Sequence, residues 1–254
     1  TGSGFTFPWK KADAKLEVPK DSIALTGRYE LEPVDPKLRE QLDAAKRLTL
    51  DKKFADAERI YHKLARPGAE PGFLANLNPL ELTSGSDPAL APYAGKNRAK
   101  YPKSVYEEAL FGEAECQRQQ KNYRSAVDTY TKLLLEFPHT RYTATSCKGL
   151  FEIADYWLEP TRRQMDEYQE QLQGKRWMVT PVSFIHFGKD MPTLDAEGHA
   201  TTILNTIRVH DINGEMGKRA LLYLGTIHFF RKDYKEADFY FMQLYKDYPN
   251  SPDA

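Results

Sequence analysis

Histidine, cysteine and carboxylate side chains at fixed short spacings would indicate a metal site or a catalytic centre in this sequence. The six histidines are His62, His139, His186, His199, His210 and His228. None belongs to an HExxH motif, and His199 and His210 are too far apart to lie on adjacent turns of one helix. His186, within FIHFG, is the one histidine retained as a candidate for a metal or catalytic role, against the simpler interpretation of a structural histidine.

Motifs of nucleophilic and nucleotide chemistry are absent as well. The sequence contains no GxSxG, Walker A or Rossmann glycine pattern. Its two cysteines, Cys116 and Cys147, are too few for a zinc site or a disulfide framework. Both are expected on consecutive first helices of a repeat, where a disulfide or two buried free thiols would fit, and we expect free thiols. We therefore predict a non-enzymatic protein without catalytic residues, cofactor or metal.

The composition narrows the classes of partner. The chain of 254 residues carries 36 Lys and Arg against 36 Asp and Glu, so it has no surplus of positive charge for phosphate backbones. We therefore expect no nucleic-acid partner. A mean hydropathy of −0.65 and the lack of a long apolar run argue against a membrane span.

An internal repeat dominates the sequence. KNYRSAVDTYTKLLLEFPHT, residues 121–140, recurs in spacing as KDYKEADFYFMQLYKDYPNS, residues 232–251. The shared positions are Lys121, Tyr123, Ala126, Tyr130, Leu133 and Pro138 in one copy and Lys232, Tyr234, Ala237, Phe241, Leu244 and Pro249 in the other. A weaker copy, DKKFADAERIYHKLA, lies at residues 51–65. Each copy follows an apolar helical run, which predicts a pair of antiparallel helices.

These spacings resemble the tetratricopeptide repeat, the alternative being a plain helical hairpin that recurs by chance. The resemblance implies an all-α fold, a tetratricopeptide-like helical-hairpin solenoid of about four helix pairs wound as a right-handed superhelix. We expect an extended N-terminal arm at residues 1–37 and the repeat domain at 38–254. A loop rich in Pro, Gly and Ser is predicted at 67–102.

A long insertion is predicted within the third repeat, at about residues 159–194. A polar helix follows Pro160, helical spacing is then lost, and a helix resumes after Asp195, a candidate N-cap. This insertion could be functional or could be a flap that covers one edge of the solenoid. The last predicted helix is apolar nearly all round, and we hypothesise that the natural protein continues with at least one more helix.

The concave face of such a stack, lined by the first helix of each unit, is the predicted site for an extended or helical peptide. On the repeat spacing its residues are Arg39, Leu42, Lys46, Phe111, Glu115, Arg118, Arg219, Leu222, Thr226 and Phe229. The alternative is that several of them pack against the N-terminal arm or the insertion. Leu42, Lys46, Phe111 and Glu115 depart from the Lys/Asn clamp with which related co-chaperones hold a carboxylate.

The helix ends EFPHT and DYPNS each follow a Tyr-x-x-Ala helix and fit the pattern (E/D)-(F/Y)-P-x-(S/T). In this the sequence is similar to the BamD-like outer-membrane assembly lipoproteins, over roughly residues 104–158 and 215–254. The similarity implies a scaffold at the periplasmic face of the bacterial outer membrane, whose partners are other proteins of the assembly machinery. Membrane contact would be made only through a lipid anchor that this sequence does not show. The alternatives are a cytoplasmic tetratricopeptide adaptor, or a sensor or enzyme that uses the 159–194 insertion.

Overall fold

Helical hairpins stacked side by side form the described part of the chain. A computed structural model describes residues 34–65, 102–181, 186, 188–249 and 251, so the predicted arm at 1–37 and loop at 67–102 lie almost wholly outside the described residues. The helices are α1 (Pro36–Leu50), α2 (Phe54–Ala65), α3 (Lys103–Gln119), α4 (Tyr123–Glu136), α5 (Thr143–Trp157), α6 (Glu159–Leu172), α7 (Ala196–His210), α8 (Glu215–Phe230) and α9 (Tyr234–Asp247). The predicted all-α helical-hairpin solenoid is confirmed.

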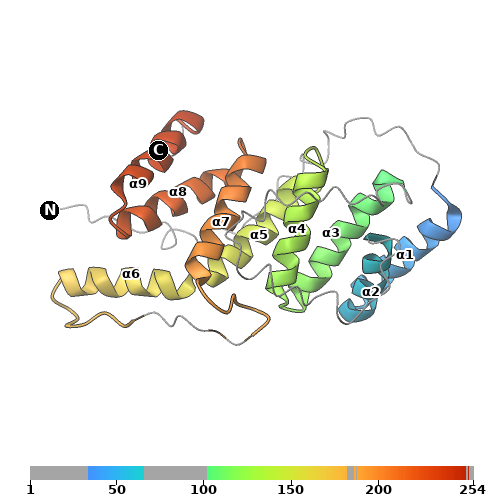
Figure 1. Ribbon diagram of the computed structural model, residues 1–254, viewed down its shortest axis with the longest axis horizontal. Coiled ribbons are helices and arrows are strands. Elements are labelled where there is room, and N and C mark those ends of the chain that lie inside the picture. Colours follow the sequence, from blue (N-terminus) through green and yellow to red (C-terminus); the bar gives the residue numbers. More distant parts are fainter. Residues whose placement is uncertain (1–33, 66–101, 182–185, 187, 250, 252–254) are drawn as a thin grey trace, which may run out of the picture.

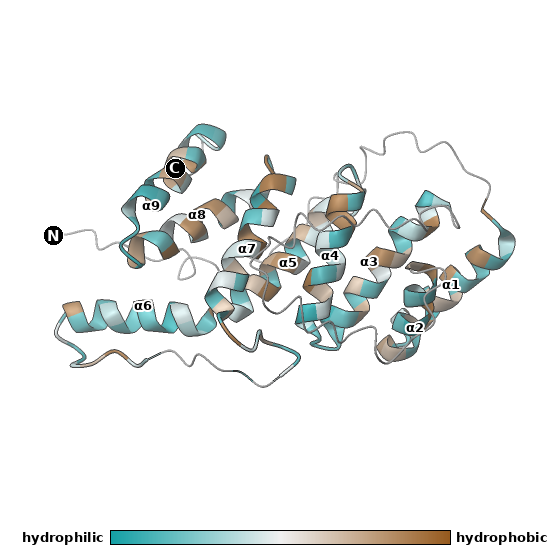
Figure 2. Ribbon diagram, in the orientation of Figure 1, coloured by the Kyte–Doolittle hydropathy of each residue, from teal (hydrophilic) through white to brown (hydrophobic). Residues whose placement is uncertain are grey.

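The hairpins are the pairs α1/α2, α3/α4, α5/α7 and α8/α9, and they follow one another along the length of the molecule (Figure 1). Within the stack, α2 packs on α3, α4 on α5, and α7 on α8. The first helices α1, α3, α5 and α8 are therefore neighbours in one layer. Hydrophobic and hydrophilic residues alternate along the hairpin helices (Figure 2), and the buried apolar side chains form two clusters, one shared by α1 to α4 and one by α3 to α9, as expected for a solenoid whose core extends between repeats.

The turns inside three of the hairpins share the same backbone conformation. Lys52, Lys121 and Lys232, which align in sequence, all have positive φ, at 59°, 58° and 66°. The next N–H donates to a carbonyl five residues earlier, for example from Asn122 to Gln117 at 2.9 Å. These hydrogen bonds satisfy carbonyl groups at the end of the first helix that have no partner within the helix. Sequence register and backbone geometry thus repeat together.

Aromatic side chains and glycines pair at two junctions between hairpins. Tyr61 of α2 lies against Gly112 of α3, where an added Cβ would be 2.5 Å from the ring. Tyr130 of α4 lies in the same way against Gly149 of α5, with an added Cβ 2.9 Å from the hydroxyl. Both rings are buried. The absence of a side chain on the facing helix is what lets the ring enter the junction.

The insertion leaves the stack at the end of α5. Helix α6 begins directly after it and lies against the C-terminal end of α8, where Tyr168 and Phe230 meet edge to face at 5.7 Å, while α7 returns to pack on α5 (Figure 1). The segment after α6 crosses back over α5, where Trp157 Nε1 donates to the Asp190 carbonyl at 2.6 Å and Tyr156 donates to the Asp190 carboxylate at 2.8 Å. Asp195 caps α7 by accepting from the Gly198 N–H at 2.9 Å, which confirms the predicted N-cap.

A substitution at Ala237 tests the packing of the hairpin formed by α8 and α9. The Ala237 methyl group is buried between α9 and the stack, so Ala237→Leu should destabilise α8 and α9 by about 1–3 kcal/mol through overpacking. Hydrogen exchange should show the loss of protection in α8 and α9 and not in α3 and α4. Lys235→Leu, on the exposed side of the same helix, is the control and should leave protection unchanged. Equal exchange in both variants would contradict a tight contact at Ala237.

Candidate protein-binding face

The layer of first helices, α1, α3, α5 and α8, forms what we call the first-helix face. Polar contacts join each neighbouring pair of these helices. Lys46 Nζ of α1 is 2.5 Å from Glu108 Oε1 of α3, and Arg118 Nη1 of α3 donates to Glu152 Oε2 of α5 at 2.7 Å. The hydroxyl of Tyr223 in α8 donates to the carboxylate of Asp155 in α5 at 3.0 Å. These contacts form a polar strip along the first-helix face from α1 to α8.

An aromatic stack lies beside the first of these contacts. The rings of Phe111 and Tyr142 are parallel within 7°, with centroids 4.1 Å apart. The Arg141 guanidinium lies 4.8 Å from the centre of the Tyr142 ring and 3.4 Å from Glu108. Burial and the nearby Glu108 carboxylate raise the pKa of Tyr142 to about 12, so its hydroxyl stays neutral and able to donate. Aromatic and arginine side chains in one half-buried cluster are the types that dominate binding energy at protein interfaces.

Arg118 is held at the centre of the face by two carboxylates. Its guanidinium lies 2.8 Å from Glu115 and 2.7 Å from Glu152, and the Tyr130 hydroxyl donates to Glu115 from below. Burial alone would lower the pKa of Arg118, but the bond to Glu115 and the neighbouring charges raise it well above its usual range. This part of the face is fixed by its own ion pairs before any partner arrives.

The predicted groove residues fall into three groups. Leu42 and Thr226 are buried in the stack, and Thr226 donates to the Leu222 carbonyl at 2.7 Å. Both side chains are therefore parts of the core and do not line an open groove. A second group makes contacts within the face or packs against it: Lys46, Phe111, Glu115, Arg118, Arg219, which pairs with Glu215 at 3.0 Å, and Leu222. Arg39 and Phe229 are exposed, and Phe229 is 55% exposed.

Sequence reasoning missed the contribution of α5 to this face. Glu152 and Asp155 link α5 to α3 and α8, although neither was among the predicted groove residues. A usable signal was present, because Gly112 and Gly149 hold the same place at successive junctions, 37 positions apart. The same step carries Glu115 to Glu152 and Arg118 to Asp155. The weak sequence likeness of α5 to the other first helices hid this register.

Cysteine and histidine side chains are isolated from one another in the described residues. Cys116 and Cys147 are buried free thiols, as predicted. Burial raises the pKa of Cys116 to about 11 and that of Cys147 further, so both remain unreactive thiols at neutral pH. His186 is half-buried, and its backbone N–H donates to the Thr193 carbonyl at 3.0 Å. Among the residues that the structure describes, no group of three or more His, Cys, Asp or Glu side chains could hold a metal ion.

In the part of the chain that the structure describes, no helix combines the length and the apolar character that a bilayer crossing requires.

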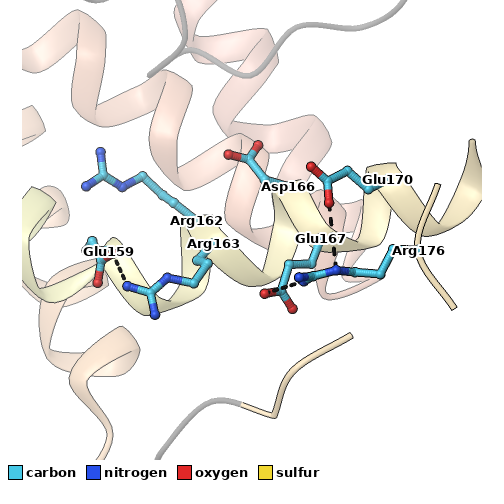
Figure 3. A pocket seen from close by; sticks show the side chains of 7 residues that line it. All are labelled: Glu159, Arg162, Arg163, Asp166, Glu167, Glu170 and Arg176. Carbon is cyan, nitrogen blue, oxygen red and sulfur yellow. Dashed lines mark hydrogen bonds and ion pairs between the residues drawn. The ribbon is translucent and has the colours of Figure 1, made fainter. Parts of the chain in front are cut away.

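The insertion forms a charged hollow along α6 (Figure 3), lined by Glu159, Arg162, Arg163, Asp166, Glu167, Glu170 and Arg176. Its charges pair with one another or with α5. Arg163 is 2.5 Å from Glu159, Arg162 is 2.8 Å from Asp155, and Arg176 pairs with Glu167. The backbone N–H of Thr180 and the Arg176 guanidinium lower the pKa of Glu167 to about 2. The hollow is thus a clasp that holds residues 176–180 against α6.

Glu167 should titrate far below its ordinary pKa of 4.5. Because the folded-state pKa is lowered, the carboxylate holds the clasp at neutral pH and through pH 4.5, and releases it only as the pH falls towards about 2. Carboxyl ¹³C NMR should place the Glu167 midpoint near that value. Glu167→Gln should speed exchange of the Thr180 amide, which lies 2.6 Å from Glu167 Oε2.

Glu170→Gln is the matched control for this clasp. Its carboxylate is 3.8 Å from Arg176 Nε, whereas the Thr180 amide donates to Glu167, so this amide should exchange as in the wild type. A Glu167 midpoint near 4.5 would show that the clasp does not form.

The comparisons with known proteins bear on the hairpins. A family model described as the tetratricopeptide repeat matches residues 108–140 and 219–251. These segments cover most of α3 and α4 and most of α8 and α9. No curated protein matches the chain, and neither does a solved structure. The chain thus contains two tetratricopeptide repeats, at the hairpins whose sequences repeat most closely.

Proposed function

We propose that this protein is a non-enzymatic scaffold that binds an extended segment of another protein along the first-helix face. The observation that carries the proposal is the cluster of Phe111, Tyr142 and Arg141 beside the Lys46–Glu108 ion pair. Half-buried aromatic rings offer contact area at low entropic cost, and Arg141, with 47% of its side chain exposed, can bind carbonyl or carboxylate groups. Tetratricopeptide repeats generally bind proteins or peptides, which supports the same class of partner.

The charged groups along the face are already paired with one another. This favours a partner that is recognised by its shape and a few polar contacts over a partner that is recognised by a high charge. Arg118 is already shared between Glu115 and Glu152, and Lys46 between Glu108 and Asp43. A partner therefore gains little from a high charge of either sign on these groups. An extended peptide with mixed apolar and polar side chains suits such a strip best.

We further propose that the scaffold acts in the bacterial envelope, in the manner of the BamD-like outer-membrane assembly lipoproteins. The support is the resemblance in residues 104–158 and 215–254, where EFPHT and DYPNS close their helices. In this setting the protein would be held at the periplasmic face of the outer membrane by a lipid anchor. Cell fractionation tests it: the protein should be found with outer membranes and be released by detergent, whereas recovery in the cytoplasm would refute the assignment.

Site-specific photo-crosslinking tests the binding face in cells. A photoreactive residue at Thr145, which precedes Glu152 of the first-helix face by two turns of α5, should yield crosslinks to partner proteins. The same residue at Lys63, exposed on α2, should give none. Arg141→Glu should reduce the Thr145 crosslinks by about tenfold, the loss typical of an interface hot spot.

Arg59→Glu is the matched charge reversal for this test. The Arg59 side chain is 79% exposed and lies on α2, which is not one of the helices of the first-helix face. This variant should leave the Thr145 crosslinks unchanged. Crosslinks that form equally from Lys63, or that survive Arg141→Glu, would place the partner on another surface.

A further inference from the structure

The turn that follows α6 exposes three large apolar side chains. Leu172, the last residue of α6, is 71% exposed, Trp177 is 87% exposed and Met178 is 53% exposed. The turn lies at the end of α6 that is far from α5 (Figure 1), and hydrophobic colour appears there at the end of a mostly hydrophilic helix (Figure 2). A cluster of exposed apolar side chains, one of them a tryptophan, indicates an interaction site. We call residues 172–178 the α6 tip.

The backbone of the α6 tip is held by its own hydrogen bonds. Gly174 has a positive φ of 71°, and the Lys175 N–H donates to the Glu170 carbonyl at 2.9 Å, which closes the end of α6. The Gln171 side chain donates to the Trp177 carbonyl at 3.2 Å. Because the turn is already ordered, binding through it costs little conformational entropy.

The clasp at Glu167 anchors the segment that returns from the tip. Arg176 pairs with the Glu167 carboxylate, and the Thr180 N–H donates to it at 2.6 Å. Trp177 and Met178 therefore lie between two anchored residues. Their side chains are exposed by a fixed backbone, and the clasp acquires a role in presenting them.

The α6 tip is too small for a protein interface of ordinary size. A stable interface uses about 20–30 residues and ~800 Å² on each partner, whereas residues 172–181 are ten residues. The adjoining surface of α6 is the charged hollow, where Arg163 pairs with Glu159 and Arg176 with Glu167. The apolar patch does not continue into this hollow. The same limit of area applies to a second copy of the chain.

A lipid bilayer needs no such area, because lipid surrounds any side chain that enters it. Tryptophan is enriched where the acyl chains meet the headgroups, since its ring is apolar and its N–H is polar. Leucine and methionine side chains can reach further, into the acyl region. Lys175 is exposed on the same turn and can meet the negative charge of anionic headgroups.

We infer that the α6 tip is a membrane-contact site, which inserts Leu172, Trp177 and Met178 into the interface of a bilayer that contains anionic lipid. Lys175 lies among the headgroups. The contact depends neither on the first-helix face nor on the envelope assignment, and it would be additional to a lipid anchor. Three side chains give weak and reversible binding, as a single acyl chain does, so the tip orients a protein that other contacts hold near the membrane.

Co-sedimentation with vesicles of phosphatidylcholine and phosphatidylglycerol tests the inference on the whole chain. The wild-type protein should bind, and Leu172→Ser and Trp177→Ala should each weaken binding by about tenfold, since each removes an apolar side chain whose transfer out of water drives insertion. Leu50→Ser is the matched control. Leu50 is 82% exposed at the end of α1, and its replacement should leave vesicle binding unchanged.

Tryptophan fluorescence locates the contact. The chain contains Trp9, Trp157 and Trp177. In a Trp9→Phe protein, vesicles with brominated acyl chains should quench the emission. The further change Trp177→Phe should abolish this quenching, because the remaining Trp157 is buried in the stack.

Charge reversal tests the role of the headgroups. Lys175→Glu should weaken binding to the vesicles that contain phosphatidylglycerol and should leave binding to pure phosphatidylcholine vesicles unchanged. Lys189→Glu is the control, because Lys189 is also exposed in the insertion but precedes Asp190, which is held on α5. It should change neither.

Three outcomes would overturn the inference. The first is the absence of vesicle binding by the wild-type protein, and the second is equal binding by the wild type, Leu172→Ser and Trp177→Ala. The third is a dimer in sedimentation velocity that Trp177→Ala dissociates, because a second copy would then cover the tip. If vesicles do not bind and a photoreactive residue at Met178 crosslinks to a protein in cells, the tip is a protein-binding site instead. Crosslinks at Thr145 and cell fractionation test the proposed function separately, so either account can fail alone.

Discussion

The stack depends on a steric constraint at its junctions, where a large ring on the second helix of one hairpin requires a bare stretch of backbone on the first helix of the next. Tyr61 with Gly112 and Tyr130 with Gly149 meet this constraint at successive junctions. Each pair fixes both the separation and the axial register of two helices, because the ring fits only opposite the glycine. Once the register is set, the polar residues that link the first helices come within bonding distance.

Polar contacts between first helices are thus a consequence of packing rather than its cause. Lys46 with Glu108 and Arg118 with Glu152 are partly exposed pairs, and pairs of this kind stabilise a fold only modestly. Their role is to give the face a fixed pattern of charge next to the Phe111–Tyr142 stack. Packing at the junctions therefore accounts for both the rigid interior and the fixed pattern of charge on the binding face.

Much of the fold was predictable from sequence, because the spacing of Tyr123, Ala126 and Tyr130 recurs at Tyr234, Ala237 and Phe241. The N-cap at Asp195 was predictable too, since a carboxylate before a helical run has a local cause. The binding face was harder. Leu42 and Thr226 were expected in a groove but are buried. Consensus spacing predicts on which side of a helix a residue lies, but it does not predict how deeply the side chain is buried. Contacts between distant residues, such as Tyr223 with Asp155, depend on tertiary packing that no local pattern encodes.

The measurement that tests the junction most directly is a double-mutant cycle of Gly112→Ala and Tyr61→Leu, followed by urea unfolding. Replacing glycine by alanine inside a helix ordinarily raises the free energy of unfolding by about 1 kcal/mol. The sign of the change measured for Gly112→Ala therefore reports on the contact with Tyr61. We predict that Gly112→Ala destabilises the wild-type protein, where Tyr61 fills the space, and stabilises the Tyr61→Leu protein, where the ring is gone. The same effect of Gly112→Ala in both backgrounds would contradict a stack set by rings and glycines.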